Sequence, residues 1–421
     1  MVVYPNRRNQ LVYRRLKPGE SAPTSVLPLL LALYGGMECG RLFWDDFVAY
    51  HLALGFKTAP HEKCLLCLTR GGEWIKFCFH VDDSVHVSYG DKLWHWYLEQ
   101  LGKRYKYTEG EVTDHLGTRY RIDRKKKTIQ MDQILSIEKM LRHLNMEGCK
   151  PAKTPAFGGQ LPCEADCPTC PKELARVMNS FPMGACIGSL IWLEQTKPGL
   201  VFVIRILSKA IKKYGELHIK WAKHAVRWVA YTKHQPLTYR AGYELGLQIF
   251  TDASHAGCQD TRRSLAGVIV KYGGNTLWCK AMWLQIVAHS SQESELMSEF
   301  RGMTIGQYVT RLQDELGGPP QRPVPIFVDN QAALDFVHNP IQTGRNLHMH
   351  ARFYYAQDCV HDGEFKPLKI ASEDQISDLL VSWKGRPNFD KLYPLVIDCA
   401  QVEMRGEGKD RKAVWDMSLI A

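Results

Sequence analysis

Four acidic residues in the second half of this 421-residue chain could act together in one metal-dependent reaction. Asp252 and Asp329 each end an apolar, strand-like run. Glu295 follows the start of a predicted helix, and Asp378 lies on a predicted late helix. Four carboxylates that meet in one pocket cannot all stay ionised without cations, so the pattern predicts hard divalent ions, most simply Mg2+, or Mn2+. Two such ions about 4 Å apart would stabilise both the attacking and the leaving oxygen in phosphodiester hydrolysis.

The elements that must position these acids alternate between strands and helices, which predicts an α/β domain from Leu247 onward. Ser290 followed by Glu293 matches a capping box and predicts a helix from Ser291 to Leu316. Strands are expected from Leu247 up to Asp252 and at 265–272, 283–289, 325–328 and 364–370, and further helices at 331–337, at 347–361 and around Asp378.

The first half of the chain predicts a mixed α/β region followed by helices. Apolar runs at 64–69, 74–81 and 85–88 predict strands, with a tight turn at Asp82–Asp83. Helices are expected at 42–54, 134–144, 183–194, 199–214 and 222–232, a loop at 158–171 and a linker at 235–245. The polar residues after Ile397 predict a loosely ordered tail.

The composition favours an intracellular protein with a polyanionic partner. A formal net charge of +10 points to nucleic acid or another polyanion. Thirteen cysteines without an even framework, and no signal peptide, predict a reducing compartment, in the cytoplasm or nucleus. The apolar run Val26–Tyr34 is too short to span a bilayer, so no membrane partner is expected.

A series of short, different motifs follows one order along the chain from about Leu31 to Tyr393. In the first half they are Ala32–Gly35 with Arg41 and Trp44, Val81–Asp83, Leu116–Gly117, Met146–Pro151, Thr154–Pro155, Gly188–Trp192 and Thr196–Pro198. In the second half they are Thr251–Ala253, Arg262–Ser264, Asp329–Gln331 and Asp374–Gln375 with Asp378. With this series the chain resembles the C-terminal part of a copia-type LTR retrotransposon Pol polyprotein, a truncated reverse transcriptase followed by ribonuclease H.

The resemblance implies an α/β (α+β) fold with four parts. These are a truncated reverse transcriptase palm-like region at 1–156, a thumb- or connection-like helical region at 157–245, a ribonuclease H-like mixed-sheet domain at 246–395 and a flexible tail at 396–421.

The resemblance also implies hydrolysis of the RNA strand of an RNA–DNA hybrid, selected through 2′-hydroxyl contacts and groove shape. Asp252, Glu295, Asp329 and Asp378 match the family's metal-binding carboxylates. An integrase or transposase of the same superfold is disfavoured, because its glutamate comes last. The alternative is a catalytically inactive nucleic-acid-binding remnant. It is favoured by Ser254–His255, where the family has Asp-Trp, and by Leu347 and His350, where it has Lys and Asp.

Asp82 and Asp83 resemble the aspartate pair of the reverse transcriptase palm, which implies a remnant metal site. A solvated hairpin turn is the plainer interpretation of such a pair. The palm also needs a third aspartate from an earlier strand, and none of the acids before Asp82 is suitably placed. We therefore expect no polymerase activity from this chain alone, unless a partner chain supplies the missing half.

Several other polar residues have a structural and a functional interpretation. Glu293 is interpreted as the capping partner, Glu299 as a surface or supporting residue, and Asp260 as part of a turn. The cluster Cys163, Cys167 and Cys170 is interpreted as exposed loop thiols, with zinc as the alternative. Arg262 and Arg263 near Asp252, and Lys125, Lys126 and Lys127 with Arg124 in a predicted β-turn, are solvated surface or phosphate contacts.

Overall fold

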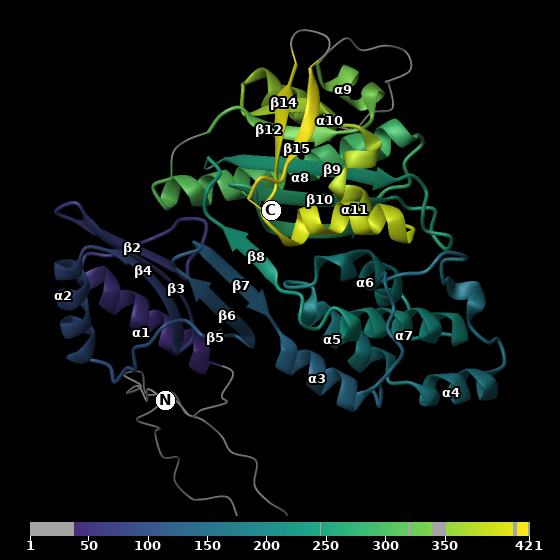
Figure 1. Ribbon diagram of the computed structural model, residues 1–421, viewed down its shortest axis with the longest axis horizontal. Coiled ribbons are helices and arrows are strands. Elements are labelled where there is room, and N and C mark those ends of the chain that lie inside the picture. Colours follow the sequence, from purple (N-terminus) through teal and green to yellow (C-terminus); the bar gives the residue numbers. More distant parts are fainter. Residues whose placement is uncertain (1–37, 245, 319–320, 339–350, 407–410, 420–421) are drawn as a thin grey trace, which may run out of the picture. The chain divides into compact units, whose positions relative to one another are not determined.

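Hydrophobic residues at alternating and helical spacings organise the chain into two units. The computed structural model describes residues 38–244, 246–318, 321–338, 351–406 and 411–419 (Figure 1). The first unit comprises residues 38–115 with Arg311–Gly318, and the second comprises the other described residues. The apolar run Val26–Tyr34, the motif Ala32–Gly35, and Leu347 and His350 lie outside the described residues.

The first unit is built on a four-stranded antiparallel sheet in the order β1-β2-β3-β4. In β3, Ile75, Phe77 and Phe79 are buried at every second position, as expected for a strand with one face on a core. Helices α1 and α2 cover that face with Phe47 and Tyr97. The elements are α1 Cys39–Ala53, β1 Lys57–Thr58, β2 Leu65–Arg70, β3 Glu73–His80, β4 Asp83–Tyr89, α2 Asp91–Gly102 and β5 Asp114–His115. The predicted helix and strands of this region are confirmed.

The second unit contains a five-stranded mixed sheet in the order β11-β10-β9-β12-β13. Strands β9, β10 and β11 are antiparallel neighbours, whereas β12 runs parallel to both β9 and β13. The strands are β9 Leu247–Ser254, β10 Leu265–Tyr272, β11 Asn275–Trp283, β12 Val324–Val328 and β13 Phe365–Lys369. This is the mixed sheet expected of a ribonuclease H-like domain, so the predicted fold class is confirmed.

Alternating side chains give this sheet two buried faces. Ile249 and Ile326 belong to a core shared with helices α8, α9 and α10. Phe250 and Phe327 belong to a second core shared with α11 and the helices α5, α6 and α7. The helices are α8 Ser291–Glu315, α9 Gln331–His338, α10 Ala351–His361 and α11 Arg386–Ile397, with 3-10 turns η3 Ser372–Asp374 and η4 Ile376–Leu380.

The rest of the second unit combines a small sheet with a helical layer (Figure 1). Strands β6, β7 and β8 are antiparallel neighbours. The helices pack through a fully buried stripe that includes Ile187, Val203 and Trp228. The elements are β6 Thr118–Asp123, β7 Thr128–Asp132, α3 Ile134–His143, η1 Glu164–Asp166, α4 Pro171–Ser180, α5 Met183–Leu193, η2 Pro198–Leu200, α6 Val201–Ser208, α7 Glu216–Tyr231 and β8 Leu237–Arg240.

Three predictions about local structure need correction. The predicted linker at 235–245 contains strand β8, which pairs with β7. The third strand of the large sheet is β11, Asn275–Trp283, and not residues 283–289. Asp378 lies on the 3-10 turn η4 instead of an α-helix.

The segment after Ile397 also differs from the expected loose tail. Strands β14 Gln401–Arg405 and β15 Lys412–Asp416 form a hairpin. The Trp415 ring stacks on the Phe250 ring at 5.2 Å between centroids, and its Nε1 donates to Asp374 O at 3.0 Å. An apolar anchor therefore holds this hairpin against the large sheet. The predicted domain boundaries at 156, 245 and 395 stay predictions.

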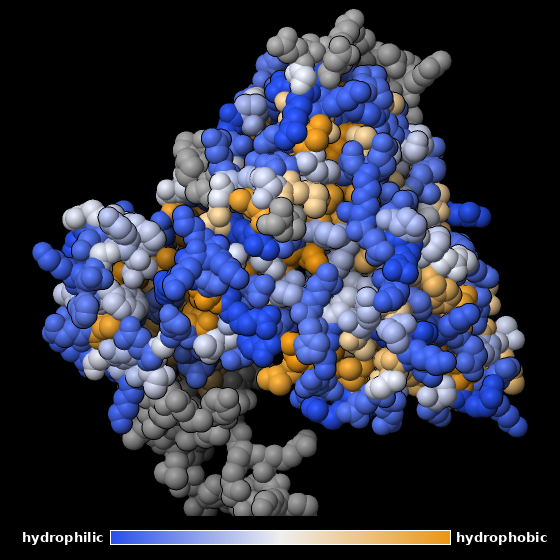
Figure 2. Space-filling view, viewed as in Figure 1, coloured by the Kyte–Doolittle hydropathy of each residue, from blue (hydrophilic) through white to orange (hydrophobic). Residues whose placement is uncertain are grey.

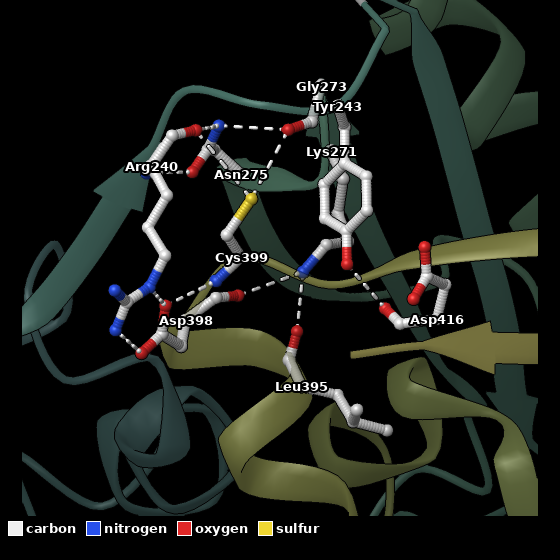
Figure 3. A network of polar contacts seen from close by, with 9 residues as sticks. All are labelled: Arg240, Tyr243, Lys271, Gly273, Asn275, Leu395, Asp398, Cys399 and Asp416. Atoms are coloured by element: carbon white, nitrogen blue, oxygen red, sulfur yellow. Dashed lines mark hydrogen bonds and ion pairs between the residues drawn. The ribbon is translucent and has the colours of Figure 1, made fainter. Parts of the chain in front are cut away.

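A buried polar network joins β8 and β10 to the end of α11 (Figure 3). The ammonium group of the fully buried Lys271 donates to Leu395 O at 2.5 Å and to Asp398 O at 3.4 Å. Arg240 pairs with both carboxylate oxygens of Asp398, at 2.6 and 2.9 Å. Because carbonyl groups at a helix C-terminus carry partial negative charge, the Lys271 ammonium group stabilises the end of α11, and Arg240 neutralises the carboxylate of Asp398 beside it.

Among the described helices, none has the combination of length and apolar character that crossing a bilayer requires. On the face seen in Figure 2, hydrophilic residues predominate and hydrophobic residues form smaller patches between them.

Candidate metal centre

Three of the four predicted acids meet at one end of the large sheet. Asp252 lies on β9, Glu295 on the first turns of α8, and Asp329 directly after β12. Each contributes a carboxylate oxygen to a group in which all three oxygens lie within 4.8 Å of one another. Asp252 and Glu295 are only 7% and 6% exposed. The structure therefore brings together residues that are far apart in sequence.

The parallel pairing of β9 with β12 explains why the two aspartates are neighbours. Phe250 and Phe327 are register partners, and each precedes its aspartate by two residues. The side-chain amide of the fully buried Gln375 donates to Thr251 O at 2.9 Å and to Phe327 O at 3.2 Å. It thus holds the ends of both strands together, immediately below the acids.

Two glycines let helix α8 approach β9 closely enough to bring Glu295 to this edge. A Cβ atom on Gly302 would lie 2.5 Å from Thr251 Cγ2, and one on Gly306 would lie 2.5 Å from Ile249 Cδ1. The Ser298 hydroxyl donates to Asp252 O at 2.8 Å and so ties the helix to the strand.

The electrostatics of the cluster fit a bound cation. Burial, together with the negative charges of Asp378 and Asp329, raises the pKa of Asp252. Burial and the charges of Asp252 and Asp329 likewise raise the pKa of Glu295, whose carboxyl group hydrogen-bonds to that of Asp252. The buried Oε2 of Glu295 has no hydrogen-bond partner among the described residues. A divalent cation would neutralise these carboxylates and give that oxygen a partner, so the donor set suits a hard ion.

Asp378 is close enough for its charge to raise the pKa of Asp252, but its carboxylate is otherwise engaged. Ser382 Oγ donates to its Oδ1 at 2.9 Å, and Lys384 forms an ion pair with its Oδ2. Asp378 is not a member of the group of three within 4.8 Å. The predicted four-acid cage is therefore three acids plus one aspartate that is paired with a lysine.

The two other glutamates of α8 have different surroundings. Glu293 accepts a hydrogen bond from the His289 N–H at 2.6 Å, and its own N–H donates to Ser290 Oγ at 3.1 Å, which confirms its capping role. The expectation that Glu299 lies at the surface is wrong, because it is 0% exposed and both carboxylate oxygens lack partners among the described residues. Burial raises the pKa of Glu299 to about 8, so a neutral acid lies one turn beyond Glu295.

The remaining predicted acids belong to the first unit. Asp82 and Asp83 are exposed at the turn between β3 and β4, and Asp83 Oδ2 lies 3.4 Å from His115 Nδ1. Neither contributes to a close group of three metal-ligating side chains in the described part of the chain. The turn itself is confirmed, and a palm-type metal site there stays a prediction.

The predicted basic contacts are exposed, and the predicted thiols are mostly not. Arg262 and Arg263 lie in the loop before β10, and Arg124, Lys125, Lys126 and Lys127 lie in the turn between β6 and β7. Cys170 is exposed as expected, but Cys163 and Cys167 are buried, so the interpretation as exposed thiols is wrong for those two. The described cysteines belong to no close group of metal-ligating side chains.

A basic face on helix α7 was missed by the sequence reasoning. Lys220, Lys223, His224 and Arg227 line a hollow of about 420 Å³, with Glu216 as the acid in its wall. None of Lys220, Lys223 and Arg227 pairs with a carboxylate among the residues that the structure describes. The spacing i, i+3 and i+7 could have revealed this face, because these positions share one side of a helix.

Comparison with known proteins identifies the relatives of this chain. It is 27% identical to the retrovirus-related Pol polyprotein from transposon RE1 of Arabidopsis thaliana, over 90% of this chain and 25% of that protein. It is 25% identical to the corresponding polyprotein from transposon TNT 1-94 of Nicotiana tabacum, over 88% of this chain and 28% of that protein. The chain is a homologue of copia-type Pol polyproteins. This Pol homologue spans about a quarter of the length of the curated relatives it matches.

No protein-family model matches this Pol homologue. Among solved structures, LC11-RNase H1 isolated from compost has 16% identity and a TM-score of 0.26, over 35% of this chain and 96% of that one. A TM-score of this size supports no functional argument.

Proposed function

We propose that this Pol homologue is a divalent-metal-dependent ribonuclease H that hydrolyses the RNA strand of an RNA–DNA hybrid. The observation that carries the proposal is the group of buried Asp252 and Glu295 with half-buried Asp329, whose carboxylate oxygens lie within 4.8 Å of one another. The homology to Pol polyproteins supports a nucleic acid as the substrate. Mg2+ is the expected ion, with Mn2+ as its replacement, because oxygen ligands of this kind suit both.

The three acids would hold the cation, and Asp378 would complete the site from η4. A bound ion of this kind lowers the pKa of a water molecule and stabilises the leaving 3′ oxygen of the cleaved RNA. The chain's own contribution is to hold the carboxylates in place through Gln375 and Ser298 before the substrate arrives. Because Asp252 and Glu295 are buried, their charges act in a poorly screened environment.

Exposed cations of the second unit would position the hybrid. The basic face of α7 offers three charges that no described carboxylate neutralises, and Arg262 and Arg263 follow β9 near the acids. We propose these side chains, with Lys125, Lys126 and Lys127, as phosphate contacts. The 2′-hydroxyls of the RNA strand and the shape of the hybrid would provide the selectivity.

The test compares a ligand variant with a surface variant of the same chemistry. Asp329→Asn should abolish cleavage of a labelled RNA strand in a hybrid with Mg2+ or Mn2+. Asp335→Asn is the matched control, because Asp335 is exposed on α9, where its Oδ1 accepts a hydrogen bond from Gln331 Nε2 at 2.9 Å. If purified wild-type protein cleaves no hybrid RNA with either ion, the proposed activity is wrong.

A non-catalytic nucleic-acid-binding protein is the second candidate. It is favoured by the ion pair between Lys384 and Asp378, because a ligand engaged by a lysine is less available to a cation. Ser254 and the exposed His255, beside Asp252, point the same way, since the family resemblance implies Asp-Trp there. Salt-dependent hybrid binding without cleavage would support this candidate.

We propose that the parts of the chain before residue 246 bind nucleic acid and have no polymerase activity. Asp82 and Asp83 are exposed, and no third acid joins them among the described residues. Primer extension by this chain alone is therefore expected to be absent. We propose residues 1–156, 157–245 and 246–395 as palm-like, thumb-like and ribonuclease H-like segments, with the β14–β15 hairpin packed against the last of them.

A further inference from the structure

The fourth acid of the metal centre already has a cation beside it. The Lys384 ammonium pairs with Asp378 Oδ2, while Ser382 Oγ donates to Oδ1 at 2.9 Å. The Lys384 and Asp378 side chains are 18% and 25% exposed, so water screens their interaction only partly. Both carboxylate oxygens of Asp378 are thus satisfied within one short segment of the chain.

The position of Lys384 is set by the residue before it. The Trp383 indole Nε1 donates to Ala156 O at 3.2 Å. A Cβ atom on Gly158 would lie 2.8 Å from the Trp383 ring, so the ring packs directly on the chain at that glycine. Lys384 itself lines a narrow crevice with Ala156 and Phe389. This anchoring holds the ammonium group beside Asp378 and makes the ion pair part of the fold.

We propose that Lys384 is a positioning residue that takes the place of a second divalent cation at Asp378. This inference rests on the proposed metal centre. Asp252, Glu295 and Asp329 then bind one divalent ion tightly, and Asp378 accepts a second ion only after Lys384 has moved away. The chain is therefore a one-ion protein in its resting state, and the two-ion site expected from four acids forms only at high metal concentration or with substrate phosphate present.

The physical reason is competition between like charges. An ammonium group and a divalent cation repel each other, and a partly buried site screens that repulsion poorly. The same ammonium group offsets the negative charge of Asp378, which otherwise adds to the charge around Asp252. Lys384→Met removes the positive charge and keeps the aliphatic stem. It should therefore lower the Kd for the second ion by at least about tenfold.

The experiment counts bound Mn2+ by isothermal titration calorimetry and by the electron paramagnetic resonance signal of free Mn2+, without substrate. Wild type and Lys384→Arg should bind one equivalent tightly. Lys384→Met should bind two, the second at least about tenfold more tightly than in wild type. Lys391→Met is the matched control, because Lys391 pairs with Asp374 at 2.9 Å, an acid outside the cluster, and should leave one equivalent.

The outcomes separate this inference from the proposed function. If wild type and Asp252→Asn bind Mn2+ alike at the first equivalent, the metal centre itself is wrong. If Asp252→Asn abolishes binding while Lys384→Met titrates like wild type, the centre stands and the role of Lys384 is refuted. Should Lys384→Met melt at a much lower temperature, Lys384→Gln, which keeps a polar partner for Asp378, must show the same second equivalent. A titration of Lys384→Gln that matches wild type would then overturn the inference.

Discussion

Replacing Asp252 with asparagine should stabilise the protein when no metal is bound. The oxygens of Asp252, Glu295 and Asp329 lie within 4.8 Å of one another, and two unit charges at that distance repel by about 3 kcal/mol at an effective dielectric constant of ~20. A proton shared by Asp252 and Glu295 removes part of this repulsion. We therefore expect Asp252→Asn to raise the free energy of unfolding by about 1–2 kcal/mol in EDTA, and the Tm by about 2–3 °C.

The effect should depend on pH in a defined direction. The folded-state pKa of Asp252 is raised above its unfolded value of about 4, so the folded protein binds this proton more tightly. The stability that this proton provides is present at low pH and is lost as pH rises from about 4 through the raised value. The advantage of Asp252→Asn over wild type should therefore vanish near pH 4 and grow toward pH 8.

Metal should reverse the order of the two proteins. In about 10 mM Mg2+ the wild type gains the free energy of ion binding, whereas Asp252→Asn has lost a ligand and gains little. Differential scanning calorimetry in EDTA and in Mg2+, across this pH range, measures both effects, with Asp335→Asn as control. A lower Tm for Asp252→Asn than for wild type in EDTA at pH 8 would refute the reasoning, since it would mean that the carboxylates do not repel.

Three further predictions follow from the same geometry. Glu299→Met should make the metal-free protein about 1–2 kcal/mol more stable at pH 8, with the gain fading toward pH 5. Between these pH values the folded wild type keeps the Glu299 proton, up to its pKa of about 8, whereas the unfolded wild type releases it, so the wild type loses stability as pH rises. Urea unfolding at several pH values measures this gain. Gln375→Leu should cost about 2–4 kcal/mol in the same assay and weaken Mn2+ binding, since the carbonyl groups of two strands lose their shared donor. Lys220→Glu with Lys223→Glu should weaken hybrid binding and lower the salt slope by about 1 per lysine in fluorescence anisotropy, whereas Lys172→Glu on α4 should change neither.

The positions of Asp252 and Asp329 could be predicted because strand ends are visible in sequence. Each aspartate follows an apolar run, and parallel neighbours bring such ends to one edge. Glu295 could be predicted because the capping pair Ser290 and Glu293 fixes where α8 begins. These signals are local in sequence. The pairing of β9 with β12 is the long-range information, and it shows which strand ends are adjacent.

The misplaced features depend on packing that sequence patterns do not show. Glu299 is buried because α8 lies unusually close to the sheet, and nothing in its neighbours along the chain indicates that. The predicted bounds of the third strand were wrong because β11 lies at the edge of the described sheet, with β10 as its neighbour. Polar residues are tolerated at such an edge, and they hid the alternation of the strand. The ion pair of Lys384 with Asp378 depends on how Trp383 is anchored to Ala156, a contact across 227 residues.

The most direct test of the metal centre is a crystal of this chain soaked in Mn2+ and measured at the manganese absorption edge. An anomalous peak should lie between the carboxylates of Asp252, Glu295 and Asp329, with water oxygens as its remaining ligands. A well-diffracting crystal that binds Mn2+ elsewhere, and shows no peak among these three residues, would contradict the account.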